Sequence, residues 1–259
     1  MSDAFYEPLG DNRFRSTEHS AGPWSAGTQH LGPPSALLVR ALEALPVSAP
    51  MLLARVTVEI LGPVPVAELS VSAGVERPGR SVELLGAELS AGGRVVARAR
   101  AWRHIRADTS AVAVGVDESL APPEAGEPMH RPESWGSGYL DAMEWRALSG
   151  HLGKPGPAKV WARQGVDLVS GETPTGLQRL FVVADSGNGV SSRMDPMEWL
   201  FINSELTVHL YREPSGEWIA LDATTAIGPD GVGTAFSVLH DEHGPVGRGA
   251  QALLIRPQR

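Results

Sequence analysis

Cysteine is absent from this chain of 259 residues. Its absence excludes disulfide bonds, thiolate zinc sites and a cysteine nucleophile. Long apolar runs are also absent, and those present are far too short to cross a lipid bilayer. The first residues lack the basic and apolar regions of an export signal, so we expect a cytoplasmic protein without a membrane span.

Basic residues are fewer than acidic ones, 22 Lys and Arg against 30 Asp and Glu, which gives a net charge of −8. This charge argues against a surface built mainly to bind nucleic acid. The eight histidines form no HxxxH pair and no cluster with carboxylates, so we expect no metal site. Neither a GxSxG elbow nor a complete GxGxxG fingerprint is present, which removes two common kinds of active or nucleotide site.

Residues 29–45 contain the most apolar helix pattern in the chain. Pro33 and Pro34 suit a first helical turn, because the N–H groups there have no partner within the helix. Apolar side chains then cover nearly the whole circumference, with Arg40 and Glu43 as the only charges. Such a helix must be enclosed on most sides. We therefore expect an antiparallel sheet to wrap around it.

Strand patterns precede and follow this helix. Two short runs, 4–8 and 12–17, come before it, and longer runs with alternating apolar and polar residues follow it at 52–61, 67–77, 81–90 and 94–106. The proline-rich stretch from 107 to 135 loses the alternation and is typical of a linker. Residues 139–148 fit either a short helix or a strand.

The same plan then repeats. Residues 159–169 form a strand pattern, and Thr173 and Pro174 indicate the start of a helix that ends near Gly187 and Gly189. Four further strand runs follow at 199–212, 217–226, 232–241 and 245–256. We interpret the chain as a duplicated unit, with an N-terminal domain at 1–110, a linker at 111–150 and a C-terminal domain at 151–259.

Strand parity identifies two polar side chains that face inward. Thr225 shares a face with Leu221 and Ala223, and Gln251 shares one with Leu253 and Ile255. Buried polar groups need hydrogen-bond partners, and most of them are structural. The two residues are therefore either satisfied core residues or parts of a site.

Several stretches together resemble the acyl-CoA thioesterase family of double-hotdog enzymes, in particular its actinobacterial thioesterase-like branch. They are QHLGPPSALLVRAL in the first half, and VADSGNGVS, INSELTVHLYREPSGEWIALDATT and GVGTAFSVLHDEHGPVGRGAQALLIRP in the second. The resemblance implies an α+β double hotdog, with two tandem units that each wrap a long antiparallel sheet around one buried helix. It also implies hydrolysis of acyl-CoA thioesters in fatty acid metabolism without a cofactor, and a homo-oligomer, a dimer or higher.

In that family an acid, a hydroxyl residue and a glutamine on neighbouring strands of the second hotdog hold the attacking water. The resemblance carries these roles to Glu205, Thr225 and Gln251, with Thr224 as the alternative hydroxyl. The family acid is usually aspartate. Parity places Glu205 on the polar face of its strand, so it would enter the site only if a bulge turned it inward.

The remaining candidates concern the substrate. Backbone N–H groups at the helix start, those of Gly32 and Ser35, would polarise the thioester carbonyl. His30 either contacts the substrate or caps the turn, and the second role is favoured. Asp185 is a rival acid, although the glycine-rich segment around it also suits a turn.

Two other classes of function remain open from the sequence. One is a hotdog that binds acyl-CoA or another acyl ligand without hydrolysing it, because glutamate replaces the usual aspartate. The other is an assembly module whose sheets only form interfaces between subunits.

Overall fold

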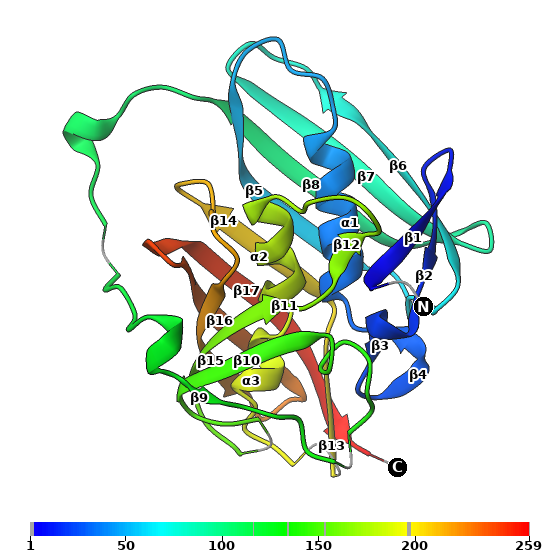
Figure 1. The fold of residues 1–259 in the computed structure, drawn as a ribbon, viewed down its shortest axis with the longest axis vertical. Coiled ribbons are helices and arrows are strands. Elements are labelled where there is room, and N and C mark those ends of the chain that lie inside the picture. Colours follow the sequence, from blue (N-terminus) through cyan, green and yellow to red (C-terminus); the bar gives the residue numbers. More distant parts are fainter. Residues whose placement is uncertain (1–2, 116, 134, 153, 196–197, 259) are drawn as a thin grey trace.

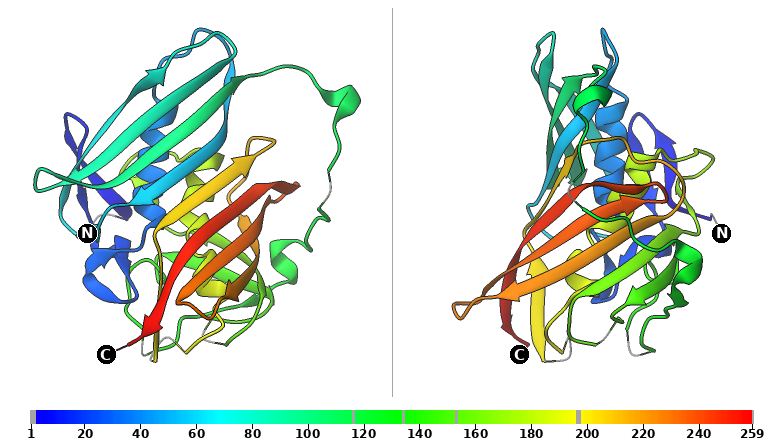
Figure 2. Two further views of the ribbon diagram at one scale, coloured as in Figure 1. Left: turned by 180° about the vertical axis from the view of Figure 1, so that it is seen from behind. Right: turned by 90° about the vertical axis from the view of Figure 1, so that its left-hand side faces the viewer.

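The computed structural model describes residues 3–115, 117–133, 135–152, 154–195 and 198–258. Fifteen described strands form one continuous sheet that curves around two central helices (Figures 1 and 2). In sheet order the strands are β12, β1, β2, β6, β7, β8, β5, β14, β17, β16, β15, β11, β10 and β9, and β13 also pairs with β17.

The elements of the first half lie close to the predicted ranges. They are β1 (Ala4–Gly10), β2 (Arg13–Ser16), a short 3-10 helix at Glu18–Ser20, β3 (Ala21–Gly22), β4 (Ser25–Gln29), α1 (Gly32–Glu43), β5 (Met51–Ile60), β6 (Glu68–Arg77), β7 (Val82–Ala91) and β8 (Arg94–Ile105).

The second half repeats the order of one principal helix followed by long strands. Its elements, after 3-10 turns at Ser110–Val112 and Pro123–Ala125, are β9 (Glu127–Pro128), β10 (Met143–Ser149), β11 (Ala158–Gln164), β12 (Asp167–Val169), α2 (Gly176–Ala184), α3 (Gly187–Val190), β13 (Trp199–Asn203), β14 (Glu205–Leu210), β15 (Ile219–Ile227), β16 (Val232–Asp241) and β17 (Gly244–Pro257). This is the double-hotdog arrangement. The domain boundaries at 110 and 150 stay a prediction.

Helix α1 is the buried helix that the apolar pattern predicts. Nine of its twelve residues are buried, from Gly32 to Val39 and again at Leu42. Pro33 and Pro34 occupy the first turn, where a missing N–H costs nothing. Only the face that carries Arg40 reaches solvent, and there the guanidinium binds Glu172.

Helices α1 and α2 pack antiparallel at the centre of the molecule (Figure 1). The beginning of α1 lies against the end of α2, where a Cβ on Gly32 would come within 2.1 Å of the Val182 carbonyl oxygen. At the opposite end, Gln178 donates to the Glu43 carboxylate at 2.7 Å. Burial raises the pKa of Glu43 above its usual 4.5.

The start of α2 differs from the prediction. Thr173 was expected to cap the helix, but Thr175 does so, its hydroxyl accepting a hydrogen bond from Gln178 N at 3.1 Å. Pro174 consequently precedes the helix. The two glycines expected at its end instead lie in the one-turn helix α3.

A break in register at Ser204 divides the predicted strand 199–212 into β13 and β14. Asn203 pairs with Leu253, whereas Thr207 pairs with Ala250, so one extra residue is accommodated between them. Such a bulge reverses which residues face the core. Asn203 therefore points inward together with Phe201, and after the break Leu206 does so.

The two halves meet along the pairing of β5 with β14, where Val56 and Val58 lie opposite Val208 and Leu206. A second junction forms where β12 pairs in parallel with β1. Residues 106–126 arch from β8 to β9 outside the sheet (Figure 1). Among the helices of the described residues, none is long and apolar enough to span a membrane.

Replacing Gly32 by alanine tests the contact between the helices. The added methyl group would collide with the backbone of Val182, so we expect the free energy of unfolding to fall by about 1–3 kcal/mol, measured by urea denaturation. Gly74→Ala is the matched control, because nothing lies within 4 Å of its new methyl group. Equal stability of the two variants would contradict the close packing.

Candidate functional site

The end of α2 and the start of α1 create a polar corner inside an apolar interior. Asp185 is the residue that ends α2, and its side chain is only 6 % exposed. His30, just before α1, lies beside it with Nδ1 3.4 Å from Asp185 Oδ2. Both residues were substrate-site candidates from the sequence, and the antiparallel helices bring them together.

Two amide side chains from the sheet hold the Asp185 carboxylate. Asn203 Nδ2 donates to Oδ1 at 2.8 Å. Gln251 Nε2 is 3.3 Å from the same oxygen and donates to the Asp185 carbonyl at 3.0 Å. These donors occupy Oδ1, so that Oδ2 remains on the side of His30. Amide donors keep a buried carboxylate hydrogen-bonded without neutralising it.

His30 is fixed by its surroundings. Its ring stacks on Tyr139 with centroids 3.8 Å apart and an interplanar angle of 6°. Nδ1 accepts the Gly32 N–H at 3.0 Å, so the neutral ring carries its proton on Nε2. Burial lowers the pKa of His30 below its usual 6.5, and the Asp185 charge opposes this shift only in part.

Tyr139 completes this side of the corner. Its hydroxyl bonds the Val182 carbonyl and the Ser186 hydroxyl, each at 2.9 Å. Burial raises the pKa of Tyr139 well above its usual 10, so the phenol stays protonated. Tyr139 thus ties the end of α2 to the ring that covers His30. The sequence reasoning missed this residue because it lies in the ambiguous segment 139–148.

Thr225 and Gln251 lie on one inward face, as strand parity predicts. Both are opposite Ala235, one from β15 and the other from β17. Gln251 Oε1 accepts the Asn188 N–H at 3.0 Å, and Thr225 bonds the Ser191 hydroxyl at 2.8 Å. The two side chains therefore hold the two ends of α3. Thr224 is exposed, so of the two threonines Thr225 faces the interior.

Glu205 does not join this group. Its carboxylate accepts hydrogen bonds from Thr207 Oγ1 at 2.8 Å and from the Ala252 N–H at 2.9 Å. Thr207 in turn bonds Thr57 of β5 on the outer face of the sheet. The bulge at Ser204 has turned Asn203 inward, rather than Glu205.

Neither backbone donor predicted at the start of α1 is free. The Gly32 N–H is donated to His30 and the Ser35 N–H to the Leu31 carbonyl. His30 therefore caps the turn, which is the role favoured from the sequence. It also lines the cavity described next.

A small cavity of about 60 Å³ adjoins the corner. Its polar lining comes from His30, Ser186, Asn188 and Gly189. Its apolar lining includes the side chains of Trp24, Trp135, Trp145 and Phe201. Polar groups gathered on one part of an otherwise apolar cavity are typical of sites for small organic groups.

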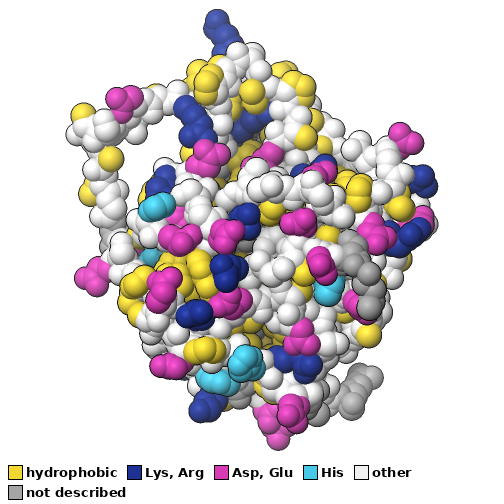
Figure 3. Space-filling view, in the orientation of Figure 1, with side chains coloured by type: hydrophobic (Ala, Val, Ile, Leu, Met, Phe, Trp, Pro, Cys, Tyr) yellow, Lys and Arg dark blue, Asp and Glu magenta, His cyan; other side chains and the backbone are white. Residues whose placement is uncertain are grey.

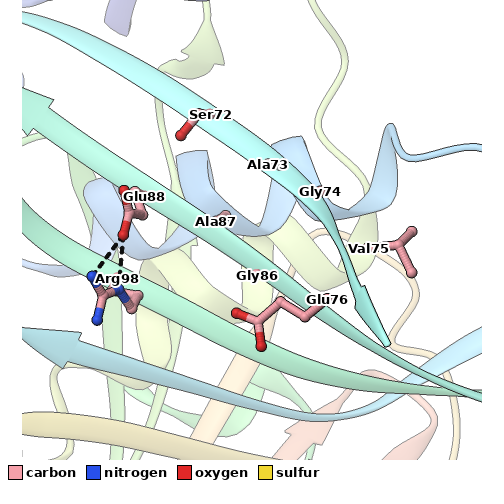
Figure 4. A pocket seen from close by; sticks show the side chains of 9 residues that line it. All are labelled: Ser72, Ala73, Gly74, Val75, Glu76, Gly86, Ala87, Glu88 and Arg98. Atoms are coloured by element: carbon pink, nitrogen blue, oxygen red, sulfur yellow. Dashed lines mark hydrogen bonds and ion pairs between the residues drawn. The ribbon is translucent and has the colours of Figure 1, made fainter. Parts of the chain in front are cut away.

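A larger hollow of about 280 Å³ lies on the outer face of β6, β7 and β8, where Gly74 and Gly86 leave space (Figure 4). Its charged groups are already paired, since Arg98 binds Glu88 at 2.6 Å and Glu76 binds Arg100 at 2.6 Å. Such surface pairs are solvated and carry no group suited to catalysis. We therefore place the candidate site at the buried corner.

The molecular surface carries intermixed acidic and basic side chains on the face shown in Figure 3. Among the described residues, no group of three or more His, Asp or Glu side chains is arranged to hold a metal ion. The donors at the corner are two amides, one carboxylate and one imidazole, which is a set suited to proton transfer and hydrogen bonding.

Comparison with solved structures supports the assigned fold. A hotdog-fold protein of unknown function from Alicyclobacillus acidocaldarius superposes with a TM-score of 0.77 at 15% identity, over 97% of this chain and 96% of that one. The acyl-CoA thioesterase II TesB2 of Mycobacterium marinum gives 0.66 at 14% identity, over 99% and 96% of the two chains. At these identities the likeness shows the fold alone.

Sequence comparison assigns the family. No curated protein sequence matches the chain. Residues 20–104 match the family described as the acyl-CoA thioesterase N-terminal domain, and residues 123–255 match the acyl-CoA thioesterase C-terminal domain. The two matches follow each other in the order expected for a double hotdog. The chain therefore belongs to the acyl-CoA thioesterase family and is a thioester hydrolase.

Proposed function

We propose that the protein hydrolyses acyl-CoA to a free acid and CoA at the cavity beside Asp185, with Asp185 as the general base. One observation carries this assignment. A buried carboxylate, held at Oδ1 by two amide donors, has its second oxygen beside a histidine that lines an apolar cavity. A base in this setting can activate a water molecule next to a bound acyl group.

The reaction would begin when Asp185 Oδ2 takes a proton from water as its oxygen attacks the thioester carbonyl carbon. The carbonyl oxygen then becomes negatively charged. Collapse of this intermediate breaks the carbon–sulfur bond, and the proton held by Asp185 passes to the departing CoA thiolate. Atoms and charges balance without a cofactor.

His30 would stabilise the charge that develops on the carbonyl oxygen. Its Nδ1 is occupied by the Gly32 N–H, which leaves the Nε2–H as a donor. A neutral donor that is already oriented before reaction stabilises an oxyanion without a reorganisation cost. Stacking on Tyr139 supplies that orientation.

Gln251 and Thr225 would act by holding the site together rather than by touching the water. Gln251 joins Asp185 to the N–H of Asn188, and Thr225 holds Ser191 at the end of α3. The part of the cavity formed by Asn188 and Gly189 thereby keeps a fixed position relative to the base. Small displacements at such positions lower rates strongly.

Asp185→Asn and Glu205→Gln distinguish the two candidate acids. We expect kcat with butyryl-CoA to fall by about 10²–10⁴-fold in Asp185→Asn and to stay within about twofold of wild type in Glu205→Gln. Release of CoA can be followed with a thiol reagent without background from the enzyme, because the chain has no cysteine. The reverse order would assign the base to Glu205, and binding without turnover in the wild type would indicate a non-catalytic acyl-CoA protein.

Replacing Gln251 by alanine removes the link between the base and α3. We expect kcat to fall by about 10–100-fold with a smaller change in KM, since the acyl cavity itself is kept. Thr224→Ala is the control, because that side chain is exposed on the neighbouring β15. A Gln251→Ala enzyme with unchanged kcat would reject the positioning role, provided both variants melt within a few degrees of wild type.

The pH dependence tests His30. Burial lowers its pKa below 6.5, so the ring is neutral at pH 7. Protonation at lower pH fills Nδ1, displaces the Gly32 N–H and pairs the imidazolium with Asp185, which blocks the base. We expect kcat to be constant from pH 8 down to about 6.5 and to decline at lower pH. A His30→Gln enzyme that shows the same decline would exclude the imidazole as its cause.

A further inference from the structure

The part of the cavity away from the polar corner is closed by aromatic side chains from separate segments. Trp24 comes from the turn between β3 and β4, Trp145 from β10 and Phe201 from β13. Trp24 meets Phe201 edge to face, with ring centroids 5.5 Å apart and an interplanar angle of 86°. An acyl group attached to a thioester at the corner would extend toward these rings.

Two of these rings are firmly packed. Phe201 is 4 % exposed and lies in a cluster with Ala235, Leu253 and Ile255. Trp145 is also 4 % exposed and meets Tyr139 edge to face at 6.2 Å. Movement of either ring would disturb close packing around it, which is costly in a protein interior. These two walls therefore limit the length of the group that enters.

The volume sets the size of that group. A site needs about 10–15 Å³ of this kind of volume for each water-sized group it holds. The cavity of about 60 Å³ therefore has room for about four to six such groups. A chain of four to six carbon atoms fills this space, whereas a long fatty acyl chain does not fit.

We infer that the enzyme is selective for short acyl thioesters of up to about six carbons, with Phe201 and Trp24 setting the limit. This inference rests on the proposed function, since it assumes that the acyl group of the substrate occupies the cavity. Phe201 acts as the buried end of the pocket. Trp24, which is 48 % exposed, covers that end from the solvent side.

Steady-state kinetics with acetyl-, butyryl-, hexanoyl-, octanoyl-, decanoyl- and palmitoyl-CoA test the inference. We expect kcat/KM of the wild type to be highest at four to six carbons and to fall at least about tenfold by decanoyl-CoA, since a methylene that fits or clashes typically changes discrimination by about tenfold or more. A preference for decanoyl- or palmitoyl-CoA would overturn it.

Phe201→Ala and Trp24→Ala should move the optimum to longer chains. We expect the ratio of kcat/KM for octanoyl-CoA over butyryl-CoA to rise about tenfold in Phe201→Ala, with a smaller rise in Trp24→Ala. Phe236→Ala is the matched control, because Phe236 is 53 % exposed on β16 and does not line the cavity. An unchanged ratio in both cavity variants would remove these residues as the determinants of chain length.

Binding measurements separate failure of this inference from failure of the proposed function. If no acyl-CoA is hydrolysed, the proposed function fails, and calorimetric titration of the same acyl-CoA series still decides the size limit. Tightest binding of butyryl- or hexanoyl-CoA, weakened for palmitoyl-CoA, would support the inference. Equal or tighter binding of palmitoyl-CoA would overturn it.

Discussion

The close approach of two antiparallel helices is the constraint on which the rest of the structure depends. Gly32 allows the first turn of α1 to touch the backbone of α2 at Val182. That contact sets His30, which precedes α1, beside Asp185, which ends α2. Neither residue could reach the other if a side chain at position 32 held the helices apart. One missing Cβ thus determines both the packing and the composition of the site.

The site is shared between the two halves of the chain. His30 belongs to the first half, whereas Asp185, Asn203 and Gln251 belong to the second, and Tyr139 precedes the second-half strands. The position in the first half that matches Gln251 is Arg100, whose guanidinium lies on the outer face and binds Glu76. Duplication supplied the common framework, and divergence supplied different groups to a single corner.

Much of the architecture could be predicted from the sequence because it follows from local patterns. The apolar residues of α1 and the alternation in β5 to β8 report burial directly, and the inward side of Thr225 and Gln251 follows from the same alternation. The acid did not follow, because a one-residue bulge at Ser204 changes parity. The separation of five between Phe201 and Leu206, both buried, is odd and carried that signal. The aromatic cavity could not be predicted, since loops far apart in the chain contribute its walls.

The pairing of β5 with β14 has a consequence for synthesis of the protein. β5 ends at Ile60, and its partner begins only at Glu205. The ribosome therefore produces a long stretch of chain while one edge of the first sheet still presents unpaired N–H and C=O groups. Exposed edges of this kind readily recruit other strands. The outer-face residues Arg55 and Glu59 on that edge would discourage such contacts until β14 arrives.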